Sequence, residues 1–185
     1  LINVTSFFRD VSAWEYLKDK IVPALNQLKQ PDGVLRVWSA GCASGQEPYS
    51  IAMLLAEQLG MDQFQHRVKI YASDMDQDAL NEARQGSYAP KDVEMVPPPL
   101  RDKYFKRTGD RYVLHADLRR AVIFGRHDLI ADAPISRLDL LICRNTLMYF
   151  NAEMQDHILS RFHFALNGTG YLFLGKAEML LTDTN

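Results

Sequence analysis

The sequence predicts an α/β fold in which helices cover both faces of a doubly wound, mostly parallel sheet. Strand-like apolar runs alternate with segments of helical periodicity along the chain, an order that is typical of βαβ units. The runs at 34–40 and 137–145 are largely apolar and rich in branched side chains, as expected of strands that are buried on both faces of a parallel sheet. A small antiparallel β subdomain is predicted beside this sheet.

The first predicted element is a helix that runs to about Lys29. Ser12 and Glu15 have the spacing of a capping box, which marks the start of a helix. Pro23 is expected to bend this helix, because proline has no backbone N–H to donate. The buried strand at 34–40 follows.

A glycine-containing loop leads from this strand into a second helix, which has Pro48 near its first turn and ends at Gly60. The next strand is predicted at 68–73. A short helix then covers residues 76–85 and is ended by Gly86.

The predicted β subdomain covers about residues 104–126 and follows an irregular stretch with three prolines at 97–99. Short strand-like runs at 111–115 and 121–125 flank the polar segment 116–120. This pattern predicts an antiparallel hairpin that is closed by a turn.

The last part of the chain returns to the main sheet. The strand at 137–145 precedes a helix from about Ala152 to Leu166, whose apolar side chains recur at helical spacing. A final strand is predicted at 170–175. All these elements form one domain that spans residues 1–185.

The composition excludes several classes of protein. The chain has 185 residues, 47% of them hydrophobic, which is enough for one domain with its own core. No apolar run approaches the roughly 20 residues that a membrane-spanning helix needs, and no signal-peptide pattern is present. The net charge of −2 argues against a general nucleic-acid binder.

The cysteines and histidines indicate a cytoplasmic protein with no metal site. Cys42 and Cys143 have neither metal-binding nor redox spacing, so they are expected to be free thiols in a reducing compartment. The five histidines are scattered and do not have the spacing of zinc ligands.

Polar segments follow the predicted strands where a parallel sheet binds its ligand, beyond the carboxyl ends of the strands. The first of these segments contains Gly41 and Gly45, with three residues between them and no lysine. It therefore matches neither a P-loop nor the glycine pattern of nicotinamide-binding folds. Glu47 stands at the start of the following helix, where a carboxylate competes with any bound phosphate. S-adenosylmethionine, an adenosine with a sulfonium, an ammonium and a carboxylate but no phosphate, fits this loop.

Three further carboxylates follow the next strands. Asp74 is placed to accept hydrogen bonds from both ribose hydroxyls of an adenosine, whereas Asp76 is better placed to cap the next helix. Asp128 is placed to accept from the adenine amino group. For Glu47 the residues alone leave two explanations open, a ligand contact and a favourable charge at a helix N-terminus.

Five motifs then show a resemblance to a known family. The segments "NVTSFFRD", "VWSAGCASGQEPYSIAM", "YASDMDQDALNEARQGSY", "CRNTLMYF" and "GYLFLGKAE" occur in this order between Asn3 and Glu178. They resemble the CheR family of chemotaxis receptor methyltransferases, and the resemblance covers nearly the whole chain. It implies a Rossmann-like class I methyltransferase fold and S-adenosylmethionine as cofactor, with S-adenosylhomocysteine as its product.

The resemblance also implies the reaction and the residues of the site. Glutamate side chains on the cytoplasmic helices of chemoreceptors would become glutamyl methyl esters, in a protein that does not insert into the membrane. The cofactor-binding residues that it implies are Asn3, Thr5, Arg9, Glu47, Asp74, Asp128, Leu129, Asn145 and Thr146. At the Asp128 position many members of the family carry Asn.

Methyl transfer to glutamate needs no general base, because a glutamate with a pKa of about 4.3 is already ionised near neutral pH. Catalysis then consists of holding the oxygen in line with the S–CH3 bond and excluding water. Arg9 is the catalytic candidate, because its guanidinium can orient a carboxylate of the cofactor or of the substrate; the alternative is a surface salt bridge. Tyr149 either borders the transferred methyl or belongs to the core.

Two departures from the family pattern predict a chain that is shortened at both ends. The basic helical domain that precedes the "FFR" segment in the family is absent, and the strand pair expected after "GKAE" is missing. The first residue is Leu1 rather than Met, which also indicates a piece of a longer protein. Further domains are expected in that parent protein. The hairpin expected at 111–124 is short for binding a receptor-tail peptide.

Two other functions remain open from the sequence. One is a module that binds S-adenosylmethionine as a sensor or docking domain and has lost catalysis. The other is a methyltransferase that acts on a small molecule.

The segment 101–126 is basic, with eight Lys or Arg and three Asp. Arg119 and Arg120 are the residues expected to dock the substrate through an acidic surface of the partner. The alternative is a solvated hairpin whose charges have no partner.

Overall fold

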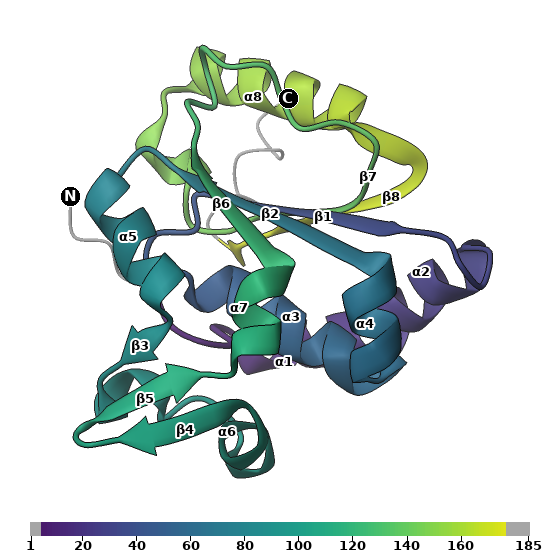
Figure 1. Ribbon diagram of the computed structural model, residues 1–185. Helices are drawn as coiled ribbons and strands as arrows, with labels where there is room; N and C mark the ends of the chain where they lie inside the picture. Colours follow the sequence, from purple (N-terminus) through teal and green to yellow (C-terminus); the bar gives the residue numbers. More distant parts are fainter. Residues whose placement is uncertain (1–4, 177–185) are drawn as a thin grey trace.

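The computed structural model of the chain describes residues 5–176 (Figure 1). Its main sheet has five strands in the order β6-β2-β1-β7-β8, and all neighbouring strands in it run parallel. These strands are β1 (Leu35–Ala40), β2 (Val68–Asp74), β6 (Val122–Arg126), β7 (Leu138–Cys143) and β8 (Leu166–Leu174). The predicted α/β fold with a parallel sheet is confirmed.

Helices cover both faces of this sheet (Figure 1). One face carries α8 (Ala152–Ala165), and the other carries most of the remaining helices. The latter are α1 (Val11–Tyr16), the π-helical turn η1 (Leu17–Ile21), α2 (Val22–Leu28), α3 (Gln46–Leu59), α4 (Met61–Arg67), α5 (Gln77–Gln85) and α7 (Ala116–Ala121).

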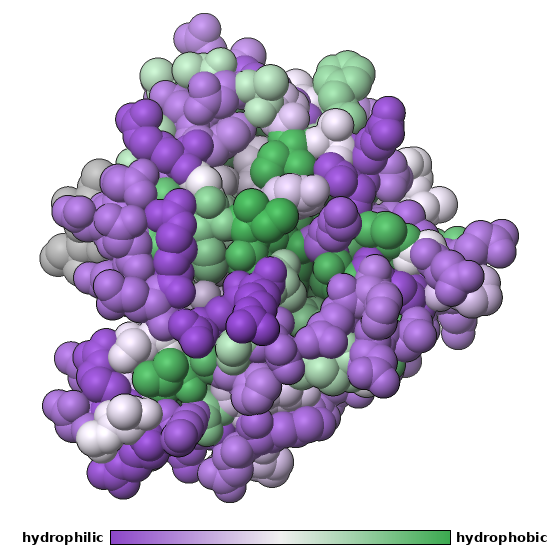
Figure 2. Space-filling model, viewed as in Figure 1, coloured by the Kyte–Doolittle hydropathy of each residue, from purple (hydrophilic) through white to green (hydrophobic). Residues whose placement is uncertain are grey.

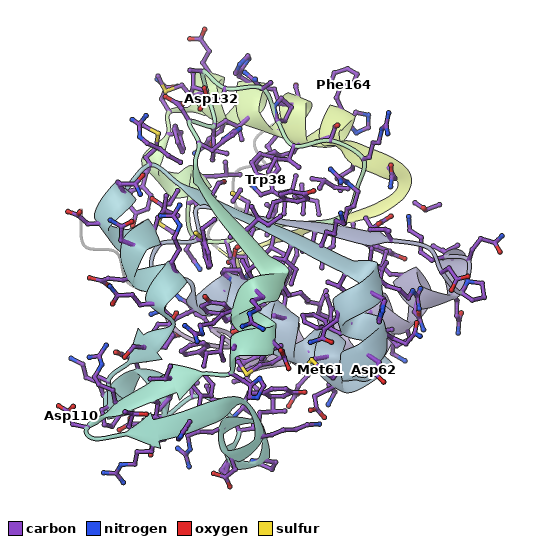
Figure 3. The ribbon with its side chains drawn as sticks, in the orientation of Figure 1. Trp38, Met61, Asp62, Asp110, Asp132 and Phe164 are labelled. Carbon is purple, nitrogen blue, oxygen red and sulfur yellow. The ribbon has the colours of Figure 1, made fainter. Side chains whose placement is uncertain are left out.

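Each face has its own hydrophobic core. Trp38 of β1 is 1% exposed and packs with Ile158 and Phe162 in the core beneath α8, as Figure 3 shows for Trp38. Ile70 of β2 belongs to the larger core on the opposite face. The sheet is therefore buried on both faces, as its apolar strands predict.

The strand order reverses at β1, because the chain passes from β1 to β2 on one side and later adds β7 on the other side. In open parallel sheets such a reversal separates the loops that follow the two strands and leaves a crevice between them. The carboxyl ends of β1, β2 and β7 meet there.

The N-terminal helix differs from its prediction. It begins at Val11 with Asp10 as N-cap, and no side chain forms a cap hydrogen bond there, so the predicted capping box of Ser12 and Glu15 is wrong. The helix is interrupted by η1 just before Pro23. A π-helical turn is a common response where the regular hydrogen-bond ladder is broken, as it is at proline.

The small antiparallel sheet has the order β3-β5-β4 and consists of β3 (Ser87–Tyr88), β4 (Phe105–Thr108) and β5 (Arg111–Leu114). The expected pairing of 111–115 with 121–125 is wrong. The predicted turn between them is the helix α7, and residues 122–126 form β6, which pairs with β2 in the main sheet.

The reason lies in long-range packing, which local alternation does not encode. Val122 of β6 lies opposite Ile70 and Phe124 lies opposite Ala72, so both apolar side chains join the core beside α3. Because β6 is the edge strand of the sheet, the side chain of Ile123 remains 55% exposed. Figure 2 shows apolar atoms at the centre of the side of the molecule that it displays. Arg84 of α5 donates to the Phe124 carbonyl, which covers part of the open edge.

The proline-rich stretch is more regular than predicted. It contains the 3-10 helix η2 (Pro90–Val93) and α6 (Pro98–Tyr104), both of which have proline in their first turn. Proline suits that position because the first N–H groups of a helix have no intrahelical partner. The short helix α4 directly after Gly60 was not predicted either.

Candidate functional site

A cavity of about 400 Å³ lies beyond the carboxyl ends of β1, β2, β6 and β7. This volume falls within the usual range for small-molecule sites. The predicted site residues that line it are Thr5, Arg9, Glu47, Asp74, Asp128, Leu129, Asn145 and Thr146. Asn3 lies outside the described residues, and Arg119 and Arg120 do not line the cavity.

The glycine loop forms one wall of the cavity. Gly41 has a φ of 75°, and its N–H donates to the Ser73 carbonyl at the end of β2. A Cβ atom on Gly41 would lie 2.3 Å from Oγ1 of Thr146. Glycine is therefore required here both by the positive φ and by the close approach of the loop that follows β7.

Asp74 joins this loop to β2. Its Oδ2 accepts from the backbone N–H of Ala43 at 2.8 Å, and its Oδ1 accepts from the backbone N–H of Asp76 at 3.0 Å. A carboxylate has about four acceptor positions, so each oxygen retains one for a ligand. Asp74 is thus a rigidly held acceptor pair on the cavity wall.

Glu47 lies in the first turn of α3, and its Oε1 accepts from the hydroxyl of Ser39 at 2.7 Å. Ser39 is fully buried in β1. The carboxylate is therefore held at the cavity by a fixed donor, in addition to the favourable field of the helix N-terminus. None of the cavity-lining residues that the structure describes is a lysine.

Asp76 has the structural role that its position favours. Its Oδ1 accepts from the backbone N–H groups of Asp78 and Ala79 at 3.0 and 3.1 Å, which caps α5. It is not among the residues that line the cavity. The two carboxylates of the "SDMD" segment therefore have different roles, although they are only two positions apart: Asp74 lines the cavity and Asp76 caps α5.

Asp128 is tied into the turn that follows β6. Its Oδ1 accepts from the backbone N–H groups of Ile130 and Ala131 at 2.8 and 3.1 Å, and these bonds lower the pKa of the carboxyl. Its own N–H donates to Asp132. The side chain thus shapes the cavity wall through Oδ1, a role that the sequence did not indicate.

The "FFR" segment is fixed by its two phenylalanines. Phe7 is fully buried and packs edge-to-face against Tyr88 and Phe105 of the small sheet. The N–H of Phe8 donates to the hydroxyl of Ser50 in α3 at 3.0 Å. Phe8 has a φ of 49°, an uncommon backbone conformation for a bulky residue, and these contacts hold it. Arg9, the next residue, is thereby positioned at the cavity.

Arg144 is a site residue that sequence reasoning missed. It follows β7 directly, is 6% exposed, and donates to the Arg9 carbonyl at 2.7 Å and to Asp10 Oδ2 at 2.6 Å. Its guanidinium also lies over the ring of Phe173 at 4.5 Å. A charged residue directly after the apolar run "LDLLIC" was the available signal, because a buried charge requires partners.

The cavity therefore has two kinds of wall. The loops after β1, β2 and β6 contribute carboxylates, the N-terminal segment contributes Arg9, and the loop after β7 contributes Arg144, whose guanidinium is paired with Asp10. Such a cavity suits a ligand that carries both cationic and anionic groups and that presents hydroxyls to Asp74.

Both cysteines are buried, and neither forms a disulfide within the described residues, as expected. Burial raises the pKa of Cys42, and the nearby carboxylates of Asp74 and Glu47 raise it further, so its thiol remains protonated and unreactive. Among residues 5–176, no group of three or more His, Cys, Asp or Glu is arranged to hold a metal ion. Within the same residues, no helix has the length and apolar character needed to cross a bilayer.

Arg119 and Arg120 occupy different environments on α7. The side chain of Arg119 packs against Gly86 at the end of α5, where its Cδ would lie 2.7 Å from an added Cβ, and its Nη1 donates weakly to Gln85. Arg120 is exposed. Of the two, only Arg120 presents its charge freely to solvent.

Comparisons with known proteins agree with this geometry. The family described as "CheR methyltransferase, SAM binding domain" matches residues 3–185. A chemotaxis protein methyltransferase of Listeria innocua is 37% identical over 184 residues, 100% of this chain and 68% of that protein. A 104.1 kDa protein of Rhodobacter capsulatus is 38% identical over 181 residues, 98% of this chain but 19% of that protein. The solved structure of the glycopeptide N-methyltransferase MtfA complexed with sinefungin shares the fold, with a TM-score of 0.52 at 13% identity over 92% of this chain and 54% of that one.

Proposed function

Since the chain belongs to the CheR methyltransferase family, as its SAM-binding domain, we propose that it methylates glutamate side chains on the cytoplasmic helices of chemoreceptors. S-adenosylmethionine supplies an electrophilic methyl group, and the products are glutamyl methyl esters and S-adenosylhomocysteine. The observation that carries the proposal is the carboxylate-lined cavity, in which Asp74 is held by two backbone N–H groups.

In this proposal, different cavity residues bind different parts of the cofactor. Asp74 accepts from the ribose hydroxyls, and Glu47 favours the cationic part of the cofactor. Asp128 and Leu129 border the adenine, and Asn145 and Thr146 close the opposite wall, with Asn3 and Thr5 as the further contacts implied by the family motif. The lining supports a single cofactor site, because the loops after β1, β2 and β6 all reach the same cavity.

Catalysis in this proposal depends on position rather than on proton transfer. A glutamate is ionised near neutral pH and needs no base, so the site must align its oxygen with the methyl group and exclude water. Arg9 provides the orienting contact through its fork of donors. The two anchored phenylalanines and Arg144 hold the Arg9 backbone in place, and this reduces the entropy lost on alignment.

The partners belong to the same proposal. We assign substrate docking to the basic surface of 101–126, with Arg120 as its exposed member on α7 and Arg119 as a packing residue with an indirect effect. The similarity to one part of a 104.1 kDa protein supports further domains in the parent protein. The cytoplasm is the compartment in which chemoreceptor helices are accessible.

The deciding experiment is incubation of the chain with methyl-labelled S-adenosylmethionine and a receptor signalling-helix fragment. We expect label that is released as methanol by mild base, which is characteristic of a methyl ester. A fragment in which the candidate glutamates are replaced by glutamine is the matched control and should remain unlabelled.

Two outcomes contradict the proposal. Tight binding of the cofactor without transfer indicates the non-catalytic sensor or docking module. Labelling of free dicarboxylic acids, with receptor helices left unlabelled, indicates a small-molecule methyltransferase.

A further inference from the structure

One buried hydrogen-bond donor on the cavity wall has no partner among residues 5–176. Trp14 of α1 lines the cavity and is 4% exposed, and its Nε1 has no acceptor within the described part of the chain. Buried N–H groups are rarely left unpaired, because burial removes the hydrogen bond that water supplies. This donor therefore requires an explanation.

The indole of Trp14 is fixed and is not free to turn toward a protein acceptor. Its ring packs edge-to-face against Phe8 at 5.6 Å and against Phe173 at 5.4 Å between ring centroids. Phe173 in turn lies beneath the guanidinium of Arg144. Aromatic rings packed in this way hold the N–H in one direction.

The neighbourhood of Trp14 selects for an anionic acceptor. An indole N–H only donates, so its partner must be an acceptor, and an ionised oxygen makes the stronger bond. Trp14 shares the cavity with Arg9, whose guanidinium favours negative charge, whereas the guanidinium of Arg144 is paired with Asp10. The cavity carboxylates, by contrast, come from the loops after β1, β2 and β6.

We propose that Trp14 is a further ligand-binding residue, whose Nε1–H donates to a carboxylate oxygen of the molecule bound in the cavity. The inference rests on the proposed function, which brings two carboxylates to this cavity: that of the cofactor's methionine moiety and that of the substrate glutamate. A small adjustment of the wall on binding gives the oxygen access to the buried N–H.

The chain offers an internal reference for this test, because it contains two tryptophans. Nε1 of Trp38 donates to the Ser73 hydroxyl at 2.9 Å, and Trp38 lies in the core on the α8 face of the sheet (Figure 3). A spectrum of the chain with ¹⁵N-labelled tryptophan therefore shows two indole N–H signals, which the Trp38→Phe variant assigns.

The experiment titrates this labelled protein with S-adenosylhomocysteine and with its decarboxylated analogue, which lacks only the carboxylate. We expect the indole N–H signal of Trp14 to move downfield with S-adenosylhomocysteine but not with the analogue. The chemical shift of the Trp38 signal should change little with either ligand. If the Trp14 signal instead moves when a glutamate-containing receptor peptide is added to the saturated protein, the substrate supplies the carboxylate. Either movement supports the proposal.

Affinity provides a second measurement. The Trp14→Phe variant keeps the aromatic packing and removes the donor, so it should bind the carboxylate-bearing ligand about tenfold more weakly, as expected for one hydrogen bond to a charged group. Its affinity for the decarboxylated analogue should equal that of the wild type. The wild-type titration does not depend on whether this variant folds.

Two results overturn the inference, and they are distinguishable. If S-adenosylhomocysteine binds and shifts backbone signals of the glycine loop while the Trp14 signal stays fixed in every titration, the N–H faces the Phe173 ring and Trp14 is only a packing residue. The proposed function then stands. If the wild-type chain does not bind S-adenosylhomocysteine, the cofactor site and the role of Trp14 fail together.

Discussion

At the scale of single residues, the cavity shows how the backbone separates the roles of similar side chains. Asp74 and Asp76 are both carboxylates at the end of β2. Asp74 joins two loops at the cavity wall, whereas Asp76 faces the first turn of α5 and accepts from its N–H groups. Only Met75 separates them in the sequence, and both side chains are the same. The direction that the backbone takes after β2 therefore decides which of the two carboxylates faces the cavity.

We predict that alanine at these two positions affects different properties, namely ligand affinity at Asp74 and stability at Asp76. Asp74→Ala should weaken S-adenosylhomocysteine binding by at least about 100-fold, because two charge-assisted hydrogen bonds to the ligand are lost. Asp76→Ala should reduce the free energy of unfolding by about 1 kcal/mol through the lost cap, with affinity nearly unchanged. Calorimetry and urea denaturation of both variants test this, and equal losses of affinity would refute the assignment of Asp74.

Asp128 leads to a prediction about pH. Backbone donors from Ile130 and Ala131 lower its pKa in the folded state. Its ionised form therefore stabilises the fold at pH values above the unfolded pKa of about 3.9, and this stabilisation is lost as the pH falls through the folded pKa.

Asp128→Asn should keep the turn, because an amide oxygen also accepts from both N–H groups, but it removes the titration. We expect a stability close to that of the wild type at pH 7 and a weaker decline between pH 5 and pH 3. Urea midpoints measured across this range test the prediction, and parallel curves for the two proteins would contradict it.

At the scale of elements, the site depends on a connection between the N-terminal segment and the end of β7. Arg144, at the end of β7, donates to the Arg9 carbonyl and to Asp10, which precedes α1. The described residues of the N-terminal segment, 5–10, form no strand or helix that could hold it. Its position therefore depends on this buried ion pair and on the packing of Phe7 and Phe8.

We predict that Arg144→Lys costs about 1.5–3 kcal/mol of unfolding free energy, because lysine keeps the charge but cannot make both hydrogen bonds in the same geometry. The matched control is Arg84→Lys. Arg84 also makes two hydrogen bonds, to Asn81 and Phe124, but is exposed, so its replacement should cost less than about 0.5 kcal/mol.

The Arg144→Lys variant should also become more sensitive to protease cleavage near residues 5–10, whereas Arg84→Lys should not. Similar stabilities and cleavage patterns for both variants would show that the connection does not hold the segment.

At the scale of the whole molecule, charge is distributed unevenly between the cavity and the small sheet. The net charge is −2, although the segment 101–126 carries an excess of basic residues. Part of this excess is used internally: Lys103 binds Glu57 of α3, and Arg119 packs against the end of α5. The exposed remainder includes Lys106, Arg107 and Arg120.

We predict that Arg120→Glu weakens association with the receptor fragment severalfold at low ionic strength, and that the difference shrinks above about 0.5 M salt, where exposed charges are screened. Lys69→Glu is the matched control, because Lys69 is also exposed but lies on β2, outside the basic segment. Equal effects of the two reversals would indicate that net charge alone, not this surface, governs association.

The sequence by itself determined the class of fold and the positions that reach the cavity. Buried strands are continuous apolar runs, and parallel strands carry their polar continuations to one edge of the sheet. For this reason the glycine loop, Asp74, Asp128 and Asn145 were predicted at one place and line one cavity. These are consequences of local composition and chain direction.

Only the tertiary structure decided which elements pair and which buried polar groups meet. Residues 122–126 have the same alternation as a hairpin strand, but Val122 and Phe124 pack into the core beside β2. The contact of Arg144 with Asp10 spans 134 residues. Pairings of this kind depend on the free energy of burial across the assembled core, which no local pattern encodes.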